Sequence, residues 1–263
     1  MSTKLTYRPE IDGLRAIAVF SVIFYHAEAK IFGKDFFTGG YIGVDIFFVI
    51  SGYLITSLIL KELKINNNFS FLNFYERRIR RIIPALFTVI LVTMPFAWFY
   101  LLPIDLIDVS KSALYTLGFS SNYYFYFSDI QYNAADSLLK PFLHTWSLSV
   151  EEQYYIIFPV ILLFSFRFFQ RYLFQIIIAV LLISLYFSDI SSKENVSLTF
   201  YSLHTRMWEL LAGSLLAYFE IKKQKRSNNK ILNQFLPIFG LILIFYSFLF
   251  FKNSIFHPSL ITV

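Results

Sequence analysis

The stretch that decides the fold is Gly39–Leu60, GGYIGVDIFFVISGYLITSLIL, in which Asp45 is the single charged residue. Its length matches the roughly 20 residues that an α-helix needs to cross the hydrocarbon core of a bilayer. Membrane-spanning strands would instead show alternating segments of about ten residues. Gly39–Leu60 does not alternate, so it predicts a transmembrane helix.

The composition of the whole chain agrees with this prediction. Of its 263 residues, 57% are hydrophobic, 21% are aromatic and only 15% are charged, and the mean hydropathy is +0.58. A soluble domain has roughly 45–50% apolar and about 25% charged residues. The difference excludes a single water-soluble core, and the predicted fold class is all-α, a polytopic bundle of transmembrane helices.

Seven apolar blocks are predicted to span the membrane, and the connections between them alternate in charge. The blocks are residues 11–30, 38–60, 80–102, 143–165, 172–188, 206–220 and 234–251. Basic residues gather in three connections, which hold Lys61, Lys64, Arg77, Arg78, Arg80 and Arg81, then Arg167 and Arg171, then Lys222, Lys223, Lys225, Arg226 and Lys230. The positive-inside rule places these connections and the N-terminus in the cytoplasm, so we expect a multi-pass protein of the inner (plasma) membrane.

The N-terminal block also has features of a cleaved signal peptide. The apolar run Ala16–Tyr25 is followed by Ala27-Glu28-Ala29, which resembles a cleavage site. Asp12 and Arg15 adjoin the run, however, and His26 lies at its end. These polar residues favour a retained first span.

The net charge of +6 does not indicate a nucleic-acid partner. The basic residues form short clusters between apolar blocks, whereas a nucleic-acid groove needs one continuous basic face. The absence of Cys excludes disulfides, thiolate metal sites and cysteine nucleophiles. No metal site is predicted.

Polar residues inside the blocks are the candidates for function. A charged side chain at mid-bilayer costs on the order of 2.5–3.5 kcal/mol, so such groups should face one another or a water-filled cavity. Arg15 and His26 lie eleven residues apart, on nearly one helix face and about 16 Å apart along the axis. A snorkelling Arg with a capping His is the structural alternative.

A second set of polar residues lies in the fourth block. His144 and Glu151 are seven residues apart on one face, with Ser147 and Tyr155 on the same side. A lone buried Glu could be a structural hydrogen-bonding group, but beside a His on the same face it indicates a site. Glu152 is rotated by about 100° and is predicted to be interfacial or paired elsewhere.

Two sets of charged residues can each have a structural or a functional role. Arg206 and Glu209 are three residues apart and can form an intrahelical ion pair that neutralises itself. The run Arg77–Arg81 is either a topological signal or a phosphate-binding set, since guanidinium forks suit phosphate.

Two further segments are also open to two interpretations. The small residues around Asp45, which include Gly43 and Gly52, permit close approach of a helix or of a ligand. The segment Pro103–Phe142 is predicted as an outside loop, and its aromatic run Tyr123–Phe127 is either an interfacial belt or a platform on which sugars stack.

Five motifs occur along the chain in a fixed order. They are Tyr7–Ala16 with His26, Gly40–Tyr53, Arg77-Arg78 with Arg81 and Pro84, His144–Tyr155, and Arg206–Leu210 with Gly213. In this order and spacing they resemble the acyltransferase-3 family, integral membrane enzymes that O-acetylate bacterial surface polysaccharides. The resemblance extends from Tyr7 to about His257.

The resemblance implies substrates and residue roles. It implies acyl-CoA, usually acetyl-CoA, as donor substrate with no permanently bound cofactor, and a carbohydrate or lipid-linked glycan such as lipopolysaccharide as acceptor, in contact with membrane lipid. His26 would be the general base, while His144 and Glu151 would orient it, complete a relay or hold the acceptor. The residues implied to bind the CoA phosphates are Arg15, Arg77, Arg78 and Arg81.

The resemblance also implies a bundle of ten spans. Residues 1–263, interpreted as one membrane acyltransferase domain, would then be a truncated member with about seven spans. Two alternatives follow: an inactive fragment, and a transporter or flippase of a polysaccharide precursor, since intramembrane His, Glu and Arg also form substrate paths. The clustered arginines and the lack of inverted symmetry favour the enzyme.

Overall fold

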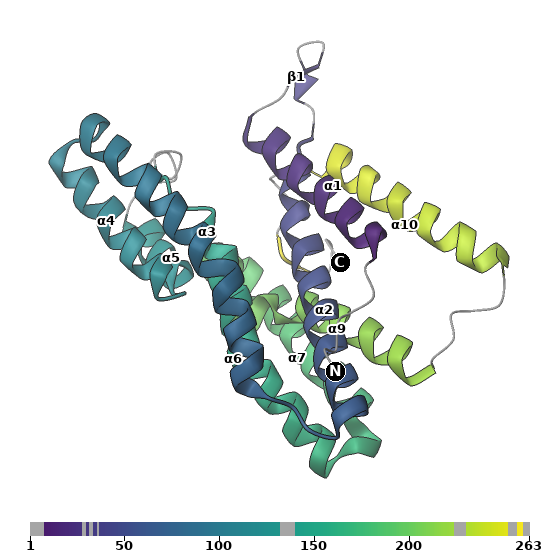
Figure 1. The fold of residues 1–263 in the computed structure, drawn as a ribbon. Helices are drawn as coiled ribbons and strands as arrows, with labels where there is room; N and C mark the ends of the chain where they lie inside the picture. Colours follow the sequence, from purple (N-terminus) through teal and green to yellow (C-terminus); the bar gives the residue numbers. More distant parts are fainter. Residues whose placement is uncertain are drawn as a thin grey trace.

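The chain folds as a helical bundle in the computed structural model, which describes residues 8–27, 30–31, 34–35, 37–131, 140–223, 230–251 and 257–259. Over these residues the only strands are β1 and β2, two residues each, which pair antiparallel (Figure 1). The prediction of an all-α fold is therefore confirmed.

The elements follow one another in a simple order. Those of the first half are α1 (Pro9–His26), β1 (Lys30–Ile31), β2 (Lys34–Asp35), η1 (Gly40–Ile42), α2 (Gly43–Asn66), α3 (Phe71–Tyr100), α4 (Pro103–Leu117) and α5 (Ser121–Gln131). Those of the second half are α6 (Thr145–Phe168), η3 (Gln170–Tyr172), α7 (Leu173–Glu194), α8 (Val196–Tyr201), α9 (Leu203–Lys223) and α10 (Lys230–Phe250).

Within the described residues, five helices are long and apolar enough to cross a membrane. They are Gly40–Asn66, Phe71–Tyr100, Thr145–Phe168, Gln170–Glu194 and Asn233–Phe250. They correspond to the second, third, fourth, fifth and seventh predicted blocks. By length and hydropathy, five of the seven predicted spans are present in the described residues. The helices α1 and α9, which cover the first and sixth blocks, are not among these five.

The packing of α9 explains why this helix is missing from the five apolar helices. This helix packs against α2 and α7, and its Arg206 and Glu209 side chains are buried. A helix that other helices enclose does not need an apolar surface toward lipid, so its polar groups face the protein interior. A measure based on hydropathy therefore omits it.

Helix α3 begins earlier than the predicted third block. Ser70 precedes it as an N-cap, and its Oγ accepts a hydrogen bond from the backbone N–H of Asn73 at 3.4 Å. The Arg77–Arg81 run therefore lies inside the helix instead of before it, and Pro84 is accommodated within the same helix.

The segment predicted as an outside loop contains two helices, α4 and α5. Leu102 precedes α4 with extended backbone, and Pro103 occupies the first helical turn, where a missing backbone N–H costs nothing. The prediction of an outside connection over Pro103–Phe142 specified no helices, and the structure has them at residues 103–117 and 121–131. Residues 132–139 of this segment lie outside the described part.

The described ends of the helices alternate between two ends of the bundle (Figure 1). We call the end that holds His26, β1–β2, Tyr100 and Thr145 the hairpin end. The opposite end, which holds Asn66, Phe71 and Phe168, also carries the basic residues near the α2–α3 and α6–α7 connections, and we call it the basic end.

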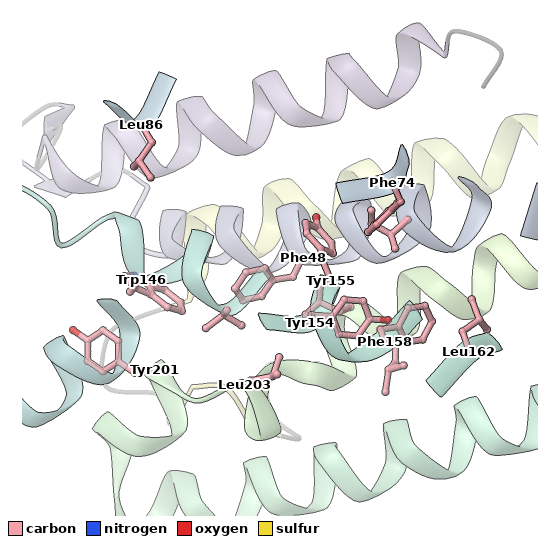
Figure 2. Close-up of a cluster of buried hydrophobic side chains, with 14 of the residues drawn as sticks. Phe48, Phe74, Leu86, Trp146, Tyr154, Tyr155, Phe158, Leu162, Tyr201 and Leu203 are labelled. Atoms are coloured by element: carbon pink, nitrogen blue, oxygen red, sulfur yellow. The ribbon is translucent and has the colours of Figure 1, made fainter. Parts of the chain in front are cut away.

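A core of large side chains holds α2, α6 and α9 together (Figure 2). The Phe48 ring meets the Trp146 ring edge-on at a centroid distance of 6.1 Å. The Tyr154 ring stacks on Phe158 at 4.6 Å, and its hydroxyl lies 2.8 Å from Ser214 Oγ. This core fixes the rotation of α6 and thereby the direction in which Glu151 points.

Glycines bring the backbones of α2 and α9 into direct contact. A Cβ atom added at Gly52 would lie 1.8 Å from the carbonyl oxygen of Leu210, and one added at Gly213 would lie 1.9 Å from that of Val49. The predicted close helix approach through small residues is confirmed.

Replacing Gly52 by Ala should therefore destabilise the fold. The new methyl group would overlap a backbone atom that cannot rotate away, and overpacking of this kind costs about 1–3 kcal/mol. The measurement is the thermal unfolding midpoint of the purified chain in detergent. Gly240→Ala is the matched control, because nothing lies within 4 Å of the added Cβ there; an equal midpoint for the two variants would contradict the prediction.

Candidate functional site

Glu151 on α6 is the centre of a half-buried polar cluster. Its Oε1 accepts a hydrogen bond from Ser51 Oγ on α2 at 2.8 Å, and its Oε2 accepts one from the Tyr155 hydroxyl at 3.3 Å. The carboxylate thus joins α2 to α6. The predicted shared face of Glu151 and Tyr155 is confirmed by this second contact.

Two guanidinium groups act on this carboxylate from other helices. Arg78 on α3 lies over the Tyr155 ring, 4.4 Å from its centroid. The positive charges of Arg78 and of Arg15 on α1 both act electrostatically on Glu151. Arg15 also lies 3.5 Å from Asp12 on its own helix. The cluster therefore combines groups from α1, α2, α3 and α6.

The arginine run on α3 divides between the interior and the surface. Arg78 packs inward, whereas Arg77 and Arg81 are exposed, because successive residues on a helix are rotated by about 100°. Arg77 Nη2 lies 3.5 Å from Glu62 Oε2. Arg77 and Arg81 thus face outward, whereas Arg78 packs against Tyr155. The role of these arginines in phosphate binding stays a prediction.

His26 ends α1 at the hairpin end and is exposed. Its Nδ1 lies 2.9 Å from the carbonyl oxygen of Val22. A carbonyl oxygen only accepts, so Nδ1 must carry the proton in this contact, and Nε2 of the neutral ring keeps its lone pair. This is the tautomer that can remove a proton from a hydroxyl group through Nε2.

His144, directly before α6, belongs with His26. Burial is the main cause that lowers the pKa of His144 below its ordinary value, a backbone hydrogen bond at Pro141 raises it, and the charge that His26 carries when it is protonated lowers it further. The two imidazoles are thus within electrostatic range at the hairpin end. Glu151, seven residues further along α6, lies about 10 Å deeper.

The assignment of His26, His144 and Glu151 to one site stays a prediction. In the structure, the two imidazoles lie at the hairpin end and the carboxylate lies deeper in the bundle. Glu152, predicted to be interfacial or paired elsewhere, is buried, and its Oε1 has no hydrogen-bond partner among the described residues.

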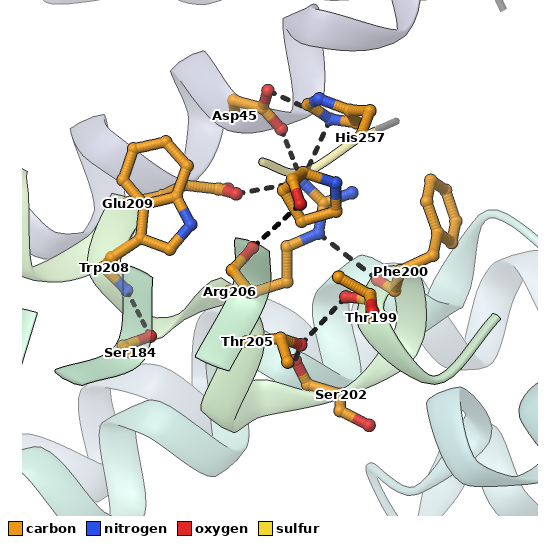
Figure 3. A network of polar contacts seen from close by, with 12 residues as sticks. Asp45, Ser184, Thr199, Phe200, Ser202, Thr205, Arg206, Trp208, Glu209 and His257 are labelled. Atoms are coloured by element: carbon orange, nitrogen blue, oxygen red, sulfur yellow. Dashed lines mark hydrogen bonds and ion pairs between the residues drawn. The ribbon is translucent and has the colours of Figure 1, made fainter. Parts of the chain in front are cut away.

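A second ionic cluster lies between α2 and α9 (Figure 3). Arg206 Nη1 donates to Glu209 Oε1 at 2.9 Å and to Asp45 Oδ1 at 2.8 Å. The predicted intrahelical ion pair is therefore confirmed, and Asp45 joins it from α2. Arg206 is only 1% exposed, and such partners offset the free-energy cost of removing the guanidinium charge from water.

His257 completes this cluster, and sequence reasoning missed it. Its Nε2 lies 3.3 Å from Asp45 Oδ2 and 3.2 Å from Arg206 Nη1. Nε2 can accept from Arg206 only when it lacks a proton, and it can donate to Asp45 only when it carries one. The contact with Arg206 therefore needs Nε2 without a proton and the contact with Asp45 needs Nε2 with one.

Aromatic rings connect the ionic cluster to His26. The ring of Tyr25 lies 5.1 Å from that of His26 and 5.7 Å from that of Tyr41, and Tyr41 lies 4.8 Å from His257. The buried atoms Tyr41 Oη and Glu209 Oε2 have no hydrogen-bond partner among the described residues. Ring contacts therefore run from His26 at the hairpin end to the ionic cluster inside the bundle.

Comparison with known proteins gives consistent results. The model of the acyltransferase domain family Acyl_transf_3 matches residues 8–263. The chain is 36% identical over 225 residues to O-acetyltransferase OatA of Staphylococcus aureus, an overlap of 82% of this chain and 36% of that protein. It is 37% identical over 216 residues to peptidoglycan O-acetyltransferase OatA of Listeria monocytogenes, covering 81% of this chain and 34% of the relative.

The chain is therefore similar to about a third of the length of these curated relatives, at 34–36% of each. No solved structure matches it.

Proposed function

The chain belongs to the Acyl_transf_3 family of acyltransferase domains, and from this premise we propose that it moves an acetyl group from acyl-CoA to a hydroxyl of a glycan. The observation that carries this proposal is the Glu151 cluster, in which the carboxylate accepts hydrogen bonds from Ser51 and Tyr155 and Arg78 lies over the Tyr155 ring. Relatives that are named O-acetyltransferases support the reaction class.

The proposed acceptor is a cell-wall glycan of the peptidoglycan class. The name of the Listeria relative specifies peptidoglycan, and this favours such a glycan over the lipopolysaccharide implied at first by the family resemblance. The acceptor would approach from the hairpin end, where His26 and His144 lie.

The proposed donor approaches from the basic end. The positive-inside rule would place that end in the cytoplasm of a cell whose plasma membrane contains the chain, with the N-terminus also inside. Arg77 and Arg81 are exposed there and suit the phosphates of CoA. Arg78 would then meet the donor between this surface and the Glu151 cluster.

The proposed reaction balances without a cofactor. His26 Nε2 takes the proton of the glycan hydroxyl while the hydroxyl oxygen attacks the thioester carbonyl. Guanidinium groups stabilise the negative charge on the resulting tetrahedral oxygen. The carbon–sulfur bond then breaks, an ester remains on the glycan, and the CoA thiolate takes the proton from His26. Direct transfer needs no acyl-enzyme, and with no Cys in the chain a thioester intermediate is excluded.

One observation favours the competing function of a transporter. The buried cluster of Asp45, Arg206 and His257 gathers a carboxylate, a guanidinium and an imidazole inside the bundle, and intramembrane ionisable groups of this kind line substrate and proton paths. Membranes that contain the chain, incubated with radiolabelled acetyl-CoA and a glycan acceptor, distinguish the two functions. Label in an ester on the glycan supports the enzyme, whereas glycan that crosses the membrane unlabelled supports the transporter.

Replacing Arg78 by Ala should weaken donor binding. A hydrogen bond to a charged group contributes about 1.5–3 kcal/mol, so the dissociation constant of acetyl-CoA should rise by roughly 10- to 100-fold. Equilibrium binding to the purified chain measures this. Arg80→Ala is the matched control, because Arg80 is exposed and pairs with Glu76 at 2.7 Å. Unchanged affinity in Arg78→Ala would leave Arg78 a structural cation over Tyr155.

A further inference from the structure

The helices α4 and α5 form a cavity of about 420 Å³ at the hairpin end, which we call the α4–α5 pocket. A volume in this range is typical of sites that bind small molecules or part of a larger ligand. The residues that line it are Leu101, Asp105, Asp108, Val109, Lys111, Ser112, Tyr115, Tyr123, Tyr124, Phe125, Phe127, Ser128 and Lys140.

The aromatic residues of this pocket fall into an anchoring and an accessible set. Phe125 is only 1% exposed and holds α5 in place. Tyr115, Tyr123 and Phe127 are 46%, 45% and 60% exposed although they line the same cavity. Accessible rings of this kind can pack against the C–H faces of a sugar ring, because aromatic side chains bury large apolar areas at defined geometry.

The charged residues of the pocket indicate that it opens to water. Asp105, Asp108, Lys111 and Lys140 all line it, and a charge in the hydrocarbon core would cost on the order of 2.5–3.5 kcal/mol each. Aromatic residues that only anchored the protein at the membrane interface would not need four charged residues around them. Carboxylates accept hydrogen bonds from sugar hydroxyls, and Lys140 Nζ already donates to Ser128 Oγ at 3.1 Å inside the pocket.

A buried set of hydroxyl groups holds the pocket at a fixed distance from the imidazoles. Thr145 Oγ1 lies 2.8 Å from Thr116 Oγ1 on α4 and 3.0 Å from Ser121 Oγ on α5. The backbone N–H of Ser121 donates to Ser149 Oγ at 3.2 Å. Because Thr145 directly follows His144, both helices of the pocket are attached to the segment that carries this imidazole.

We propose that the α4–α5 pocket binds the acceptor glycan and presents it to the imidazoles at the hairpin end. Hexose rings stack on Tyr123 and Phe127, while Asp105 and Asp108 accept hydrogen bonds from their hydroxyls. The role of this glycan as a substrate rests on the proposed function, but its binding requires neither donor nor catalysis.

The test is equilibrium binding of an N-acetylglucosamine tetramer to the purified full chain in nanodiscs, without acetyl-CoA. Saturable binding is expected, and Tyr123→Ala should raise the dissociation constant about 3- to 10-fold, the loss of one aromatic contact. Asp105→Asn tests the hydroxyl contacts and should also weaken binding. The matched control is Tyr186→Ala on α7, a similarly exposed tyrosine, which should bind as the wild type does.

The outcomes separate this inference from the proposed function. If Tyr123→Ala binds the tetramer as tightly as the wild type, or if the wild type does not bind it, the pocket is not the glycan site. If Tyr123 is needed for binding but no acetyl group is transferred, the glycan site stands and the proposed acetyl transfer fails. Transfer with an unchanged acceptor KM in Tyr123→Ala would reject the site alone.

Discussion

The variant His26→Gln is expected to lose acetyl transfer by about 10²- to 10⁴-fold, the contribution of a positioned general base. Gln keeps a polar side chain of similar reach but has no basic nitrogen. His26 is exposed at the end of α1, so the substitution removes no core packing. The measurement is radiolabelled acetate in the glycan, with the amount of membrane-inserted chain determined in parallel.

A matched control exists on another helix. His204, near the start of α9, is likewise exposed, and His204→Gln should retain wild-type transfer. Wild-type levels of product from His26→Gln would remove this residue from the role of base.

Replacing Arg206 by Met is expected to be the most destabilising single change. Met fills a similar volume, but the carboxylates of Asp45 and Glu209 would remain buried without the guanidinium that both contact at 2.8 and 2.9 Å. Removing one partner of a buried ion pair costs about 3–5 kcal/mol. The measurement is the thermal unfolding midpoint in detergent.

Removing the charges of the two carboxylates together with that of Arg206 should restore most of the lost stability. In the triple variant Arg206→Met, Asp45→Asn, Glu209→Gln no uncompensated carboxylate remains, so the midpoint should recover toward that of the wild type. Arg80→Met, which breaks an exposed pair with Glu76, should change stability by no more than about 1 kcal/mol. If Arg206→Met is as stable as Arg80→Met, the cluster contributes nothing to the fold.

The apolar blocks could be predicted well from the sequence because their signal is local. Five of the seven correspond to helices with the length and hydropathy of a membrane span. The boundary of α3 was missed because the charged run Arg77–Arg81 hid a helix that continues through it. The helices α4 and α5 were missed because their aromatic residues were attributed to a loop at the membrane interface.

The candidate site was less predictable because its contacts join distant parts of the chain. Helical spacing correctly connected Arg206 with Glu209, which are neighbours on one helix. No spacing rule connects Asp45 with His257, 212 residues later, and a single His after an apolar block carries no signal. The contact of Arg78 with Tyr155 likewise depends on how α3 crosses α6.

The glycines of α2 and α9 also restrict which parts of the protein can move during turnover. With Gly52 against the Leu210 backbone and Gly213 against that of Val49, neither helix can turn about its own axis without collision. Opening and closing around substrates would then fall to helices outside this pair, such as α3, most of whose surface is exposed. Arg78 would move with α3, so the binding of the donor and the movement of a positive charge toward Glu151 would occur in the same step.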